Sequence, residues 1–195
     1  MELLASRGYF FCGYCGSFHF PETAGDDGIR VLAETAPPLP CPVCAHTLAQ
    51  AMLDESFNVR YCANCRGALL PRASFATVVQ KRRAWAADQP APPVPLDKAE
   101  LERKVTCPAC AKRMDTHPYY GPGNVVMDSC GGCELIWLDF GELRQIVAAP
   151  GRDRGRREQV LRETVDIRTG PGGTRVGTNA DSSDLLDFVA RLISS

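Results

Sequence analysis

The chain has 195 residues, a formal net charge of -1, and 15 Pro, 17 Gly and 10 Cys. The near-neutral charge gives no support to a strongly basic nucleic-acid-binding surface, and no stretch approaches the roughly 18 apolar residues of a membrane span. Frequent Pro and Gly, with gaps in the apolar pattern, predict small modules joined by linkers. We therefore expect a soluble, cytoplasmic protein that does not enter a membrane.

All ten cysteines fall into CxxC pairs, and the first pair is Cys12 and Cys15 in the aromatic stretch "YFFCGYCGSFHFPE". The chain opens "MELLASRGYFF", which lacks the long apolar segment of a secretory signal. We therefore expect a reducing compartment, where CxxC pairs are typical metal ligands because one turn aims two thiolates at one ion. Zn²⁺ is the expected metal.

The N-terminal pair predicts a knuckle on a hairpin, but no second CxxC of its own follows it. It is a candidate third metal site with His19 as a further ligand, and a free dithiol is the alternative. Three completions of a metal site are open: His19 with one more ligand such as His46, repartnering with Cys41 and Cys44, or a site shared across a dimer. The sequence does not choose among them.

The four remaining pairs form an internal repeat. A shift of 68 positions lays Cys62 and Cys65 on Cys130 and Cys133, and the match continues without a gap from Leu69 onto Trp137. A shift of 66 lays the upstream pairs on each other, so the second copy carries two extra residues, which we place in the Gly-rich stretch at 119–124. Each copy is expected to contain two knuckles, a hairpin, another strand and a helix.

The spacings Cx2Cx17Cx2C and Cx2Cx19Cx2C are typical of zinc ribbons, in which a β-hairpin brings four thiolates around one tetrahedral ion. Metal closure also stabilises modules too small to fold on burial alone. The sequence therefore predicts two structural zinc sites, with ligands Cys41, Cys44, Cys62 and Cys65 in the first copy and Cys107, Cys110, Cys130 and Cys133 in the second.

The stretch "CGGCELIWLDFGEL" at 130–143 predicts how the second copy is completed. Gly131 and Gly132 are expected to permit the knuckle turn, and "LIWL" is apolar and β-prone. Asp139 is expected to cap a helix, with Glu142 completing a capping box.

These residues resemble the transcription factor IIB-type zinc-ribbon family. Residues 107–147 are closely similar to it, through "CPAC" and "CGGCELIWLDFGEL", although Glu134 and Leu135 stand where the family often has a glycine. Residues 41–79 resemble it with losses, since Leu69, Pro71 and Ser74 replace the Trp, Asp and Glu. The resemblance implies structural zinc and ribbon folds over about 80 residues, and it implies little about the task.

The expected fold class is a small metal-stabilised β protein with short helices: tandem zinc ribbons, each followed by a helix, behind an N-terminal knuckle-like hairpin. A proline-rich linker and a charged C-terminal segment complete the chain, and "SSDLLDFVARLIS" at 182–194 predicts an amphipathic helix. The predicted domains are 1–35 (knuckle), 36–87 (first ribbon and helix), 88–98 (linker), 99–150 (second ribbon and helix) and 151–195 (C-terminal segment).

A zinc-binding interaction module is the leading functional hypothesis, as a protein–protein scaffold or regulatory adaptor. A transcription-associated, nucleic-acid-binding protein is the alternative, supported by two basic clusters at Lys81–Arg83 and at 152–157. Two filled four-cysteine sites would move the formal charge of -1 to about -5, since each adds about -2. A thiol redox sensor and a rubredoxin-like electron carrier are less favoured.

No enzyme is expected, because both sites supply four ligands and leave no open metal position. The partner, the oligomeric state and the role of the C-terminal 45 residues are left open by the sequence.

Overall fold

The computed structural model describes residues 2–4, 9–20, 27–32 and 37–156. Residues Met1–Arg157 belong to one compact unit. The predicted C-terminal helix at 182–194 lies outside the described residues, and the domain boundaries predicted within the unit stay predictions. No described helix combines the length and the apolar character needed to cross a membrane.

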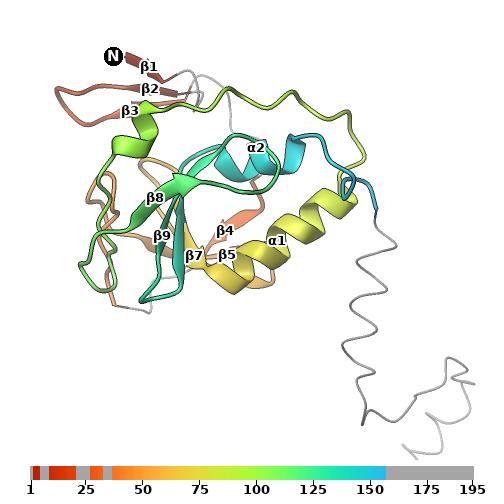
Figure 1. The fold of residues 1–195 in the computed structure, drawn as a ribbon. Helices are drawn as coiled ribbons and strands as arrows, with labels where there is room; N and C mark the ends of the chain where they lie inside the picture. The colour runs from red at the N-terminus through yellow and green to blue at the C-terminus, as the bar shows by residue number, and fades with distance from the viewer. Residues whose placement is uncertain (1, 5–8, 21–26, 33–36, 157–195) are drawn as a thin grey trace, which may run out of the picture. The chain divides into compact units, whose positions relative to one another are not determined.

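The N-terminal region forms a small antiparallel sheet of its own, in the order β1-β2-β3 (Figure 1). Its strands are β1 (Glu2–Leu4), β2 (Tyr9–Phe11) and β3 (Phe18–His19). The turn between β2 and β3 carries Cys12 and Cys15. Tyr9 is buried, with its ring centroid 5.4 Å from that of Phe18 and 6.5 Å from that of Phe140. Aromatic packing therefore anchors this hairpin.

Both cysteine-rich copies contribute to a single seven-stranded antiparallel sheet, in the order β4-β5-β6-β7-β10-β9-β8. In β5 the buried residues are Ala51 and Leu53, as expected where one face of a strand is covered, whereas β9 is buried along its whole length. The strands are β4 (Ile29–Val31), β5 (Ala49–Leu53), β6 (Phe57–Tyr61), β7 (Ala68–Pro71), β8 (Asp115–Pro118), β9 (Val126–Cys130) and β10 (Leu135–Leu138).

The two copies meet where β7 pairs with β10, and this pairing has an approximate two-fold symmetry. Leu69 lies opposite Trp137, and these two residues are also equivalent under the 68-residue repeat. The strand order β5-β6-β7-β10-β9-β8 is accordingly a mirror sequence of equivalent strands. The composition predicts small modules joined by linkers, but the two copies form two halves of one sheet.

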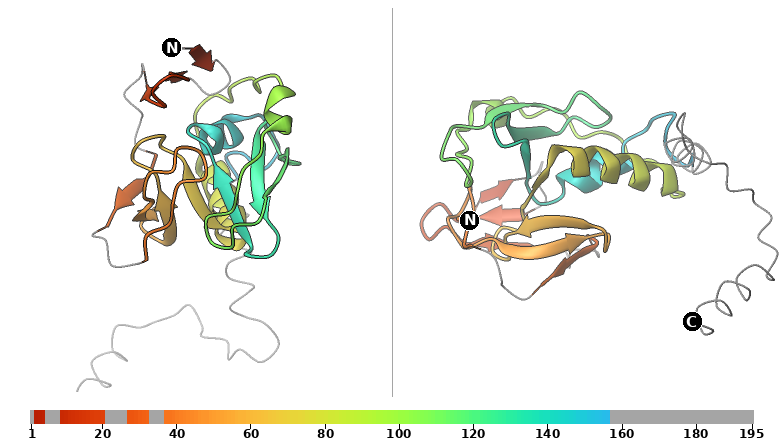
Figure 2. Two further views of the ribbon diagram at one scale, coloured as in Figure 1. Left: turned by 90° about the vertical axis from the view of Figure 1, so that its left-hand side faces the viewer. Right: turned by 90° about the horizontal axis from the view of Figure 1, so that it is seen from below.

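Two α-helices, α1 (Arg72–Trp85) and α2 (Glu142–Ala148), follow β7 and β10 and contact each other. Figure 2 shows them side by side against the sheet. Phe75, Val78 and Ile146 pack there against sheet residues such as Leu70 and Ile136 in one buried cluster. A short 3-10 helix, η1 (Ala99–Glu102), precedes the second copy and contacts β8.

The start of α2 differs from the predicted capping box. Gly141 is the N-cap residue, with φ of 85°, and no side chain caps the helix there. The carboxylate of Glu142 does accept the backbone N–H of Asp139 at 2.7 Å, which is half of a capping box. The Asp139 carboxylate instead accepts the Trp137 indole N–H at 2.9 Å. The Asp139 carboxylate therefore supports the core below the helix.

Candidate metal centres

The first candidate centre brings together the four cysteines predicted for the first copy. Their sulfur atoms all lie within 4.8 Å of one another. Two of the separations are 3.6 Å, between Cys41 and Cys65, and 3.4 Å, between Cys44 and Cys62. Sulfurs bound tetrahedrally to zinc at about 2.3 Å stand about 3.8 Å apart. The donor set and its spacing therefore fit a four-coordinate zinc ion.

The second centre repeats this arrangement with Cys107, Cys110, Cys130 and Cys133, again within 4.8 Å. The sulfurs of Cys110 and Cys130 are 3.6 Å apart. In both centres the upstream pair lies on a loop before a hairpin, and the downstream pair lies where the second strand of that hairpin ends: Cys62 follows β6 directly, and Cys130 is the last residue of β9. These are the two groups of at least three potential metal-binding side chains among the residues that the structure describes.

The knuckles share one backbone geometry. The carbonyl of the first cysteine accepts the N–H of the residue four positions later, as in Cys41 with Ala45 at 3.0 Å and Cys107 with Ala111 at 2.9 Å. That residue is left-handed, with φ of 60° at Ala45 and 58° at Ala111. In the last knuckle it is Glu134, with φ of 54°, whereas Gly131 and Gly132 do not have positive φ. The expectation that these glycines permit the turn is therefore wrong.

The thiols of the first centre share protons unequally. The hydrogen bond with Cys41 is the main cause that lowers the pKa of Cys62 to about 2, and the same bond raises the pKa of Cys41 to about 12. In the second centre the backbone N–H of Lys112 lowers the pKa of Cys110 to about 7. The hydrogen bond with Cys110 raises the pKa of Cys133 to about 12. Binding of a metal by all four sulfurs therefore requires the release of protons.

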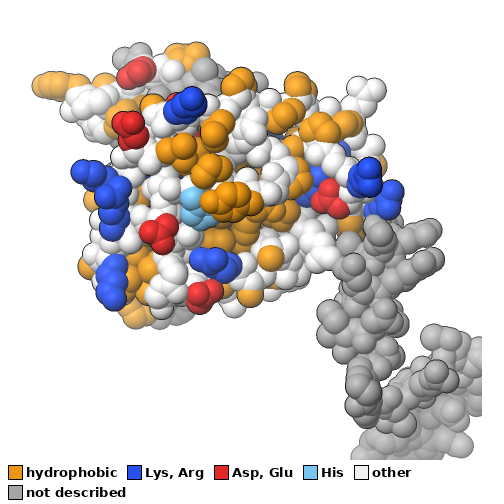
Figure 3. All heavy atoms as spheres, viewed as in Figure 1, with side chains coloured by type: hydrophobic (Ala, Val, Ile, Leu, Met, Phe, Trp, Pro, Cys, Tyr) orange, Lys and Arg blue, Asp and Glu red, His pale blue; other side chains and the backbone are white. Residues whose placement is uncertain are grey.

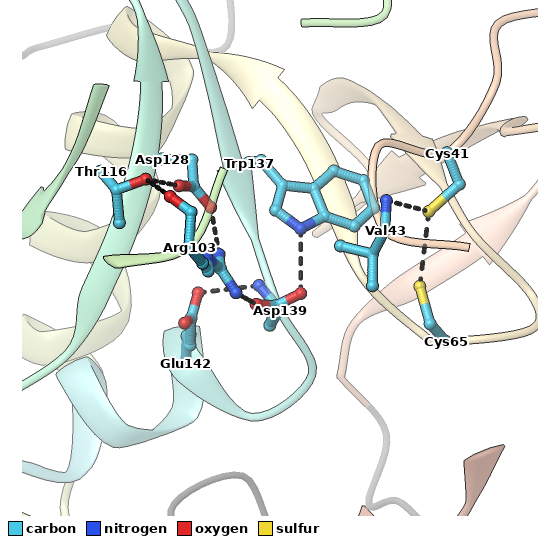
Figure 4. A network of polar contacts seen from close by, with 9 residues as sticks. All are labelled: Cys41, Val43, Cys65, Arg103, Thr116, Asp128, Trp137, Asp139 and Glu142. Atoms are coloured by element: carbon cyan, nitrogen blue, oxygen red, sulfur yellow. Dashed lines mark hydrogen bonds and ion pairs between the residues drawn. The ribbon is translucent and has the colours of Figure 1, made fainter. Parts of the chain in front are cut away.

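A shared core joins the two centres. Trp137 from the second copy is fully buried in the same cluster as Cys41, Cys65 and Cys107. Its ring lies against the knuckle of the first copy, where a Cβ added to Gly67 would stand 2.2 Å from the indole Cζ2. Figure 4 shows the Trp137 indole N–H directed at the carboxylate of Asp139. The two centres therefore share one packed core, to which the second copy contributes Trp137.

A buried polar network fixes the second ribbon (Figure 4). Arg103 forms ion pairs with Asp128 and Asp139, and Thr116 donates a hydrogen bond to Asp128 at 2.5 Å. The Asp128 side chain has no exposed surface. Sequence reasoning missed Arg103 and Asp128, although an aspartate inside the apolar strand "VVMDSC" is a signal, because a buried carboxylate requires a partner.

The N-terminal pair is in neither centre. Cys41 and Cys44 are grouped with Cys62 and Cys65, so the repartnering alternative is wrong. Cys15 is exposed, and the Ser17 hydroxyl, 3.0 Å from its sulfur, is the main cause that lowers its pKa to about 7.

The three histidines have other surroundings. His19 is exposed, with its ring centroid 6.1 Å from that of Phe10, and it forms no described group of three ligands with the N-terminal pair. His46 contacts the carbonyl of Cys44 at 3.2 Å. His117 contacts the carbonyl of Pro118 at 2.9 Å and the Ser129 hydroxyl at 3.0 Å.

Comparison with known proteins supports the second centre directly. A family model described as "Transcription factor zinc-finger", of the TFIIB-type zinc ribbon, matches residues 106–149. The match covers the second copy, and no second match covers the first. Searches of curated proteins and of solved structures found no match. The family match and the two four-cysteine groups together support a zinc-binding module, with the identity of the ion inferred from the family.

Proposed function

We propose that this protein is a zinc-stabilised interaction module that binds other proteins, as a scaffold or regulatory adaptor, through two tandem zinc ribbons. The observation that carries the proposal is that several basic residues form contacts inside the protein. Both basic clusters that favoured nucleic acid in the sequence contain arginines whose guanidinium groups form internal ion pairs and hydrogen bonds, which leaves fewer of them for phosphate contacts.

In the first cluster, Arg82 forms a two-pronged ion pair with Asp54, with distances of 3.0 and 2.7 Å, and donates to the carbonyl of Asp27 at 2.6 Å. Arg83 has no exposed surface. It donates to the carbonyls of Ile146 and Ala149 at the end of α2, at 2.6 and 2.9 Å. Lys81 is the exposed member of this cluster.

In the second cluster, Arg154 pairs with Asp88 at 2.5 Å and donates to the carbonyl of Val147 at 2.5 Å. Asp153 lies inside the same cluster and pairs with Arg83 at 2.6 Å. The pKa of Asp153 is lowered by its hydrogen bond with Arg83. Arg154 and Asp153 therefore contact the ends of the two helices, whereas Arg152 and Arg156 are exposed.

The surface itself favours a protein partner. Figure 3 shows hydrophobic side chains gathered on one face, with basic and acidic side chains scattered around them. Tyr120 is 88% exposed and Trp85 is 47% exposed. Large aromatic side chains of this kind are enriched in protein interfaces, whereas a phosphate backbone requires a continuous basic surface. The matched family is described as a transcription factor zinc-finger, which fits a regulatory adaptor and equally fits the nucleic-acid alternative.

The first arm of the experiment uses purified zinc-loaded protein and fluorescent mixed-sequence DNA and RNA, with anisotropy measured from 50 to 500 mM salt. We expect no salt-dependent binding at tens of micromolar protein, within the roughly 10⁻⁴–10⁻⁶ M range of non-specific binders. Binding that weakens steeply with salt would favour the nucleic-acid alternative.

The second arm uses chemical crosslinking in nuclease-treated extract, followed by purification of the crosslinked protein and calorimetry. We expect a complex of fixed stoichiometry that survives nuclease and varies little with salt. A complex that nuclease dissolves would contradict the proposal.

A further inference from the structure

The N-terminal CxxC turn has the geometry of the knuckles that supply the four-cysteine groups. The Cys12 carbonyl accepts the Gly16 N–H at 2.8 Å, and the Cys12 N–H donates to the Ser17 carbonyl at 3.0 Å. The Cys41 knuckle has the same two bonds at 3.0 and 2.7 Å. Gly16 is left-handed, with φ of 68°, at the position where all four ribbon knuckles have a left-handed residue. This turn is therefore preorganised as half of a zinc site.

The surroundings of the turn differ from those of the ribbon knuckles, because it is open to solvent. Cys15 is exposed, whereas every ribbon cysteine is buried or half-buried, and Cys12 is half-buried like Cys44, Cys110 and Cys133. Tyr14, between the two thiols, is 99% exposed. A large aromatic side chain at the tip of a metal knuckle is typical of a surface that becomes covered on association.

The same chain has no cysteine left to complete the site. Eight of its ten cysteines form the two ribbon groups, and the segments outside the described residues contain neither Cys nor His. His46 and His117 contact carbonyls beside their own knuckle and strand. His19 supplies at most one ligand. A four-cysteine site at this turn therefore requires thiols from another molecule.

We propose that two copies of this protein join through one zinc ion held by Cys12 and Cys15 of each copy. Each ribbon centre is itself built from two CxxC knuckles that face one ion, so the fold shows how such turns combine. A second copy offers an identical knuckle, and a two-fold axis through the ion makes the contact self-complementary. The resulting site has the four thiolates of a closed structural zinc centre.

Native mass spectrometry of the full chain tests this proposal, with zinc supplied and a phosphine reductant present to exclude disulfides. We expect a species of twice the 21.2 kDa chain mass that contains five zinc ions, an odd number that two ribbon sites per chain do not produce. Chelator should remove the bridging ion first and halve the mass, and zinc, but not magnesium, should restore the dimer.

Two variants separate the alternatives. Cys12→Ser with Cys15→Ser should give monomers that keep two zinc ions, whereas the control His19→Ala should stay dimeric with five. Three zinc ions in a monomer, or a wild-type monomer with two, would overturn the proposal. So would a dimer that persists in the double serine variant. Alkylation of Cys12 and Cys15 in zinc-loaded wild type should be slowed at least tenfold relative to the chelated protein.

Discussion

The two ribbon copies have equivalent strands but are stabilised differently. The second copy contains its own polar network, in which Arg103 pairs with Asp128 and Asp139. The first copy has Pro71 at the position of Asp139, so it lacks the carboxylate that Arg103 and Trp137 contact in the second copy. The first turn of α1 instead donates the Arg72 N–H to the carbonyl of Glu134, at 2.8 Å, in the last knuckle of the second copy. The start of α1 in the first copy is thus stabilised by a hydrogen bond to the second copy.

The core between the copies shows a second difference. Gly67 lies against Trp137. The two-fold equivalent of this pair consists of Leu135 and Leu69, which belong to the same cluster. On one side of the axis a glycine packs against a tryptophan, and on the other side two leucines take the equivalent positions. The side-chain volume is therefore distributed differently on the two sides of the axis, although both sides are packed.

The largest expected effect is an asymmetry in the loss of zinc. Binding of a structural zinc is worth about 10–16 kcal/mol, comparable with the whole stability of a domain. In a Cys12→Ser, Cys15→Ser background, we expect Cys130→Ser with Cys133→Ser to lose both zinc ions, because the first copy loses its support. Cys62→Ser with Cys65→Ser should retain one. The zinc content per chain measures this asymmetry. Equal losses in the two variants would show that the first copy does not depend on the second.

Exchange of volumes across the axis should show strong coupling. Trp137→Leu should cost about 2–4 kcal/mol of unfolding free energy by leaving a cavity, and Gly67→Leu should cost about 1–3 kcal/mol by clashing with the indole. The double variant should cost less than the sum by at least about 1 kcal/mol. Denaturant unfolding measures the cycle, and simple additivity would show that the two residues do not share one space.

Arg83 should contribute more to the free energy of unfolding than Lys81 of the same basic cluster. Arg83→Met removes the donor from the carbonyls of Ile146 and Ala149, and we expect a loss of about 1–3 kcal/mol. The matched variant Lys81→Met changes an exposed residue and should stay within about 0.5 kcal/mol. Thermal or denaturant melts of the zinc-loaded proteins compare them, and equal effects would contradict a structural role for this cluster.

The smallest effect concerns equivalent helix starts. Glu142→Ala removes the acceptor of the Asp139 N–H, and we expect a cost of about 1 kcal/mol. Ser74 occupies the equivalent position of the first copy, and Ser74→Ala should cost less than about 0.5 kcal/mol. A larger effect of Ser74→Ala would indicate that α1 is capped by its own residues after all. The same unfolding assay applies.

The ligand groupings could be read from the sequence because CxxC spacing is a local signal. The 68-residue repeat also aligned Leu69 with Trp137, the residues that pair across the axis. The repeat did not reveal that the equivalent strands β7 and β10 pair with each other. Pairing between strands far apart in the sequence depends on how the two copies pack, and no local motif specifies that. The alignment of Leu69 with Trp137 shows that these residues are equivalent, and only the structure shows that they are also neighbours.

The errors concerned residues whose role depends on tertiary surroundings. Asp139 fits a helix cap by position, but its carboxylate contacts the Trp137 indole and the Arg103 guanidinium, and a hydrogen bond to a charged partner is strong. Gly131 and Gly132 fitted a turn by composition, although the left-handed residue is Glu134. The basic run at Lys81–Arg83 was expected on the surface, because a sequence does not show which carbonyls a buried arginine will reach.

The central claim is that each copy holds zinc with four sulfur ligands. X-ray absorption at the zinc edge tests it most directly, on the Cys12→Ser, Cys15→Ser variant with its metal content counted in the same sample. We predict two zinc ions per chain, each with four sulfurs at about 2.3 Å and no nitrogen or oxygen neighbour. Iron in place of zinc, or a shell that contains nitrogen or oxygen, would contradict the account.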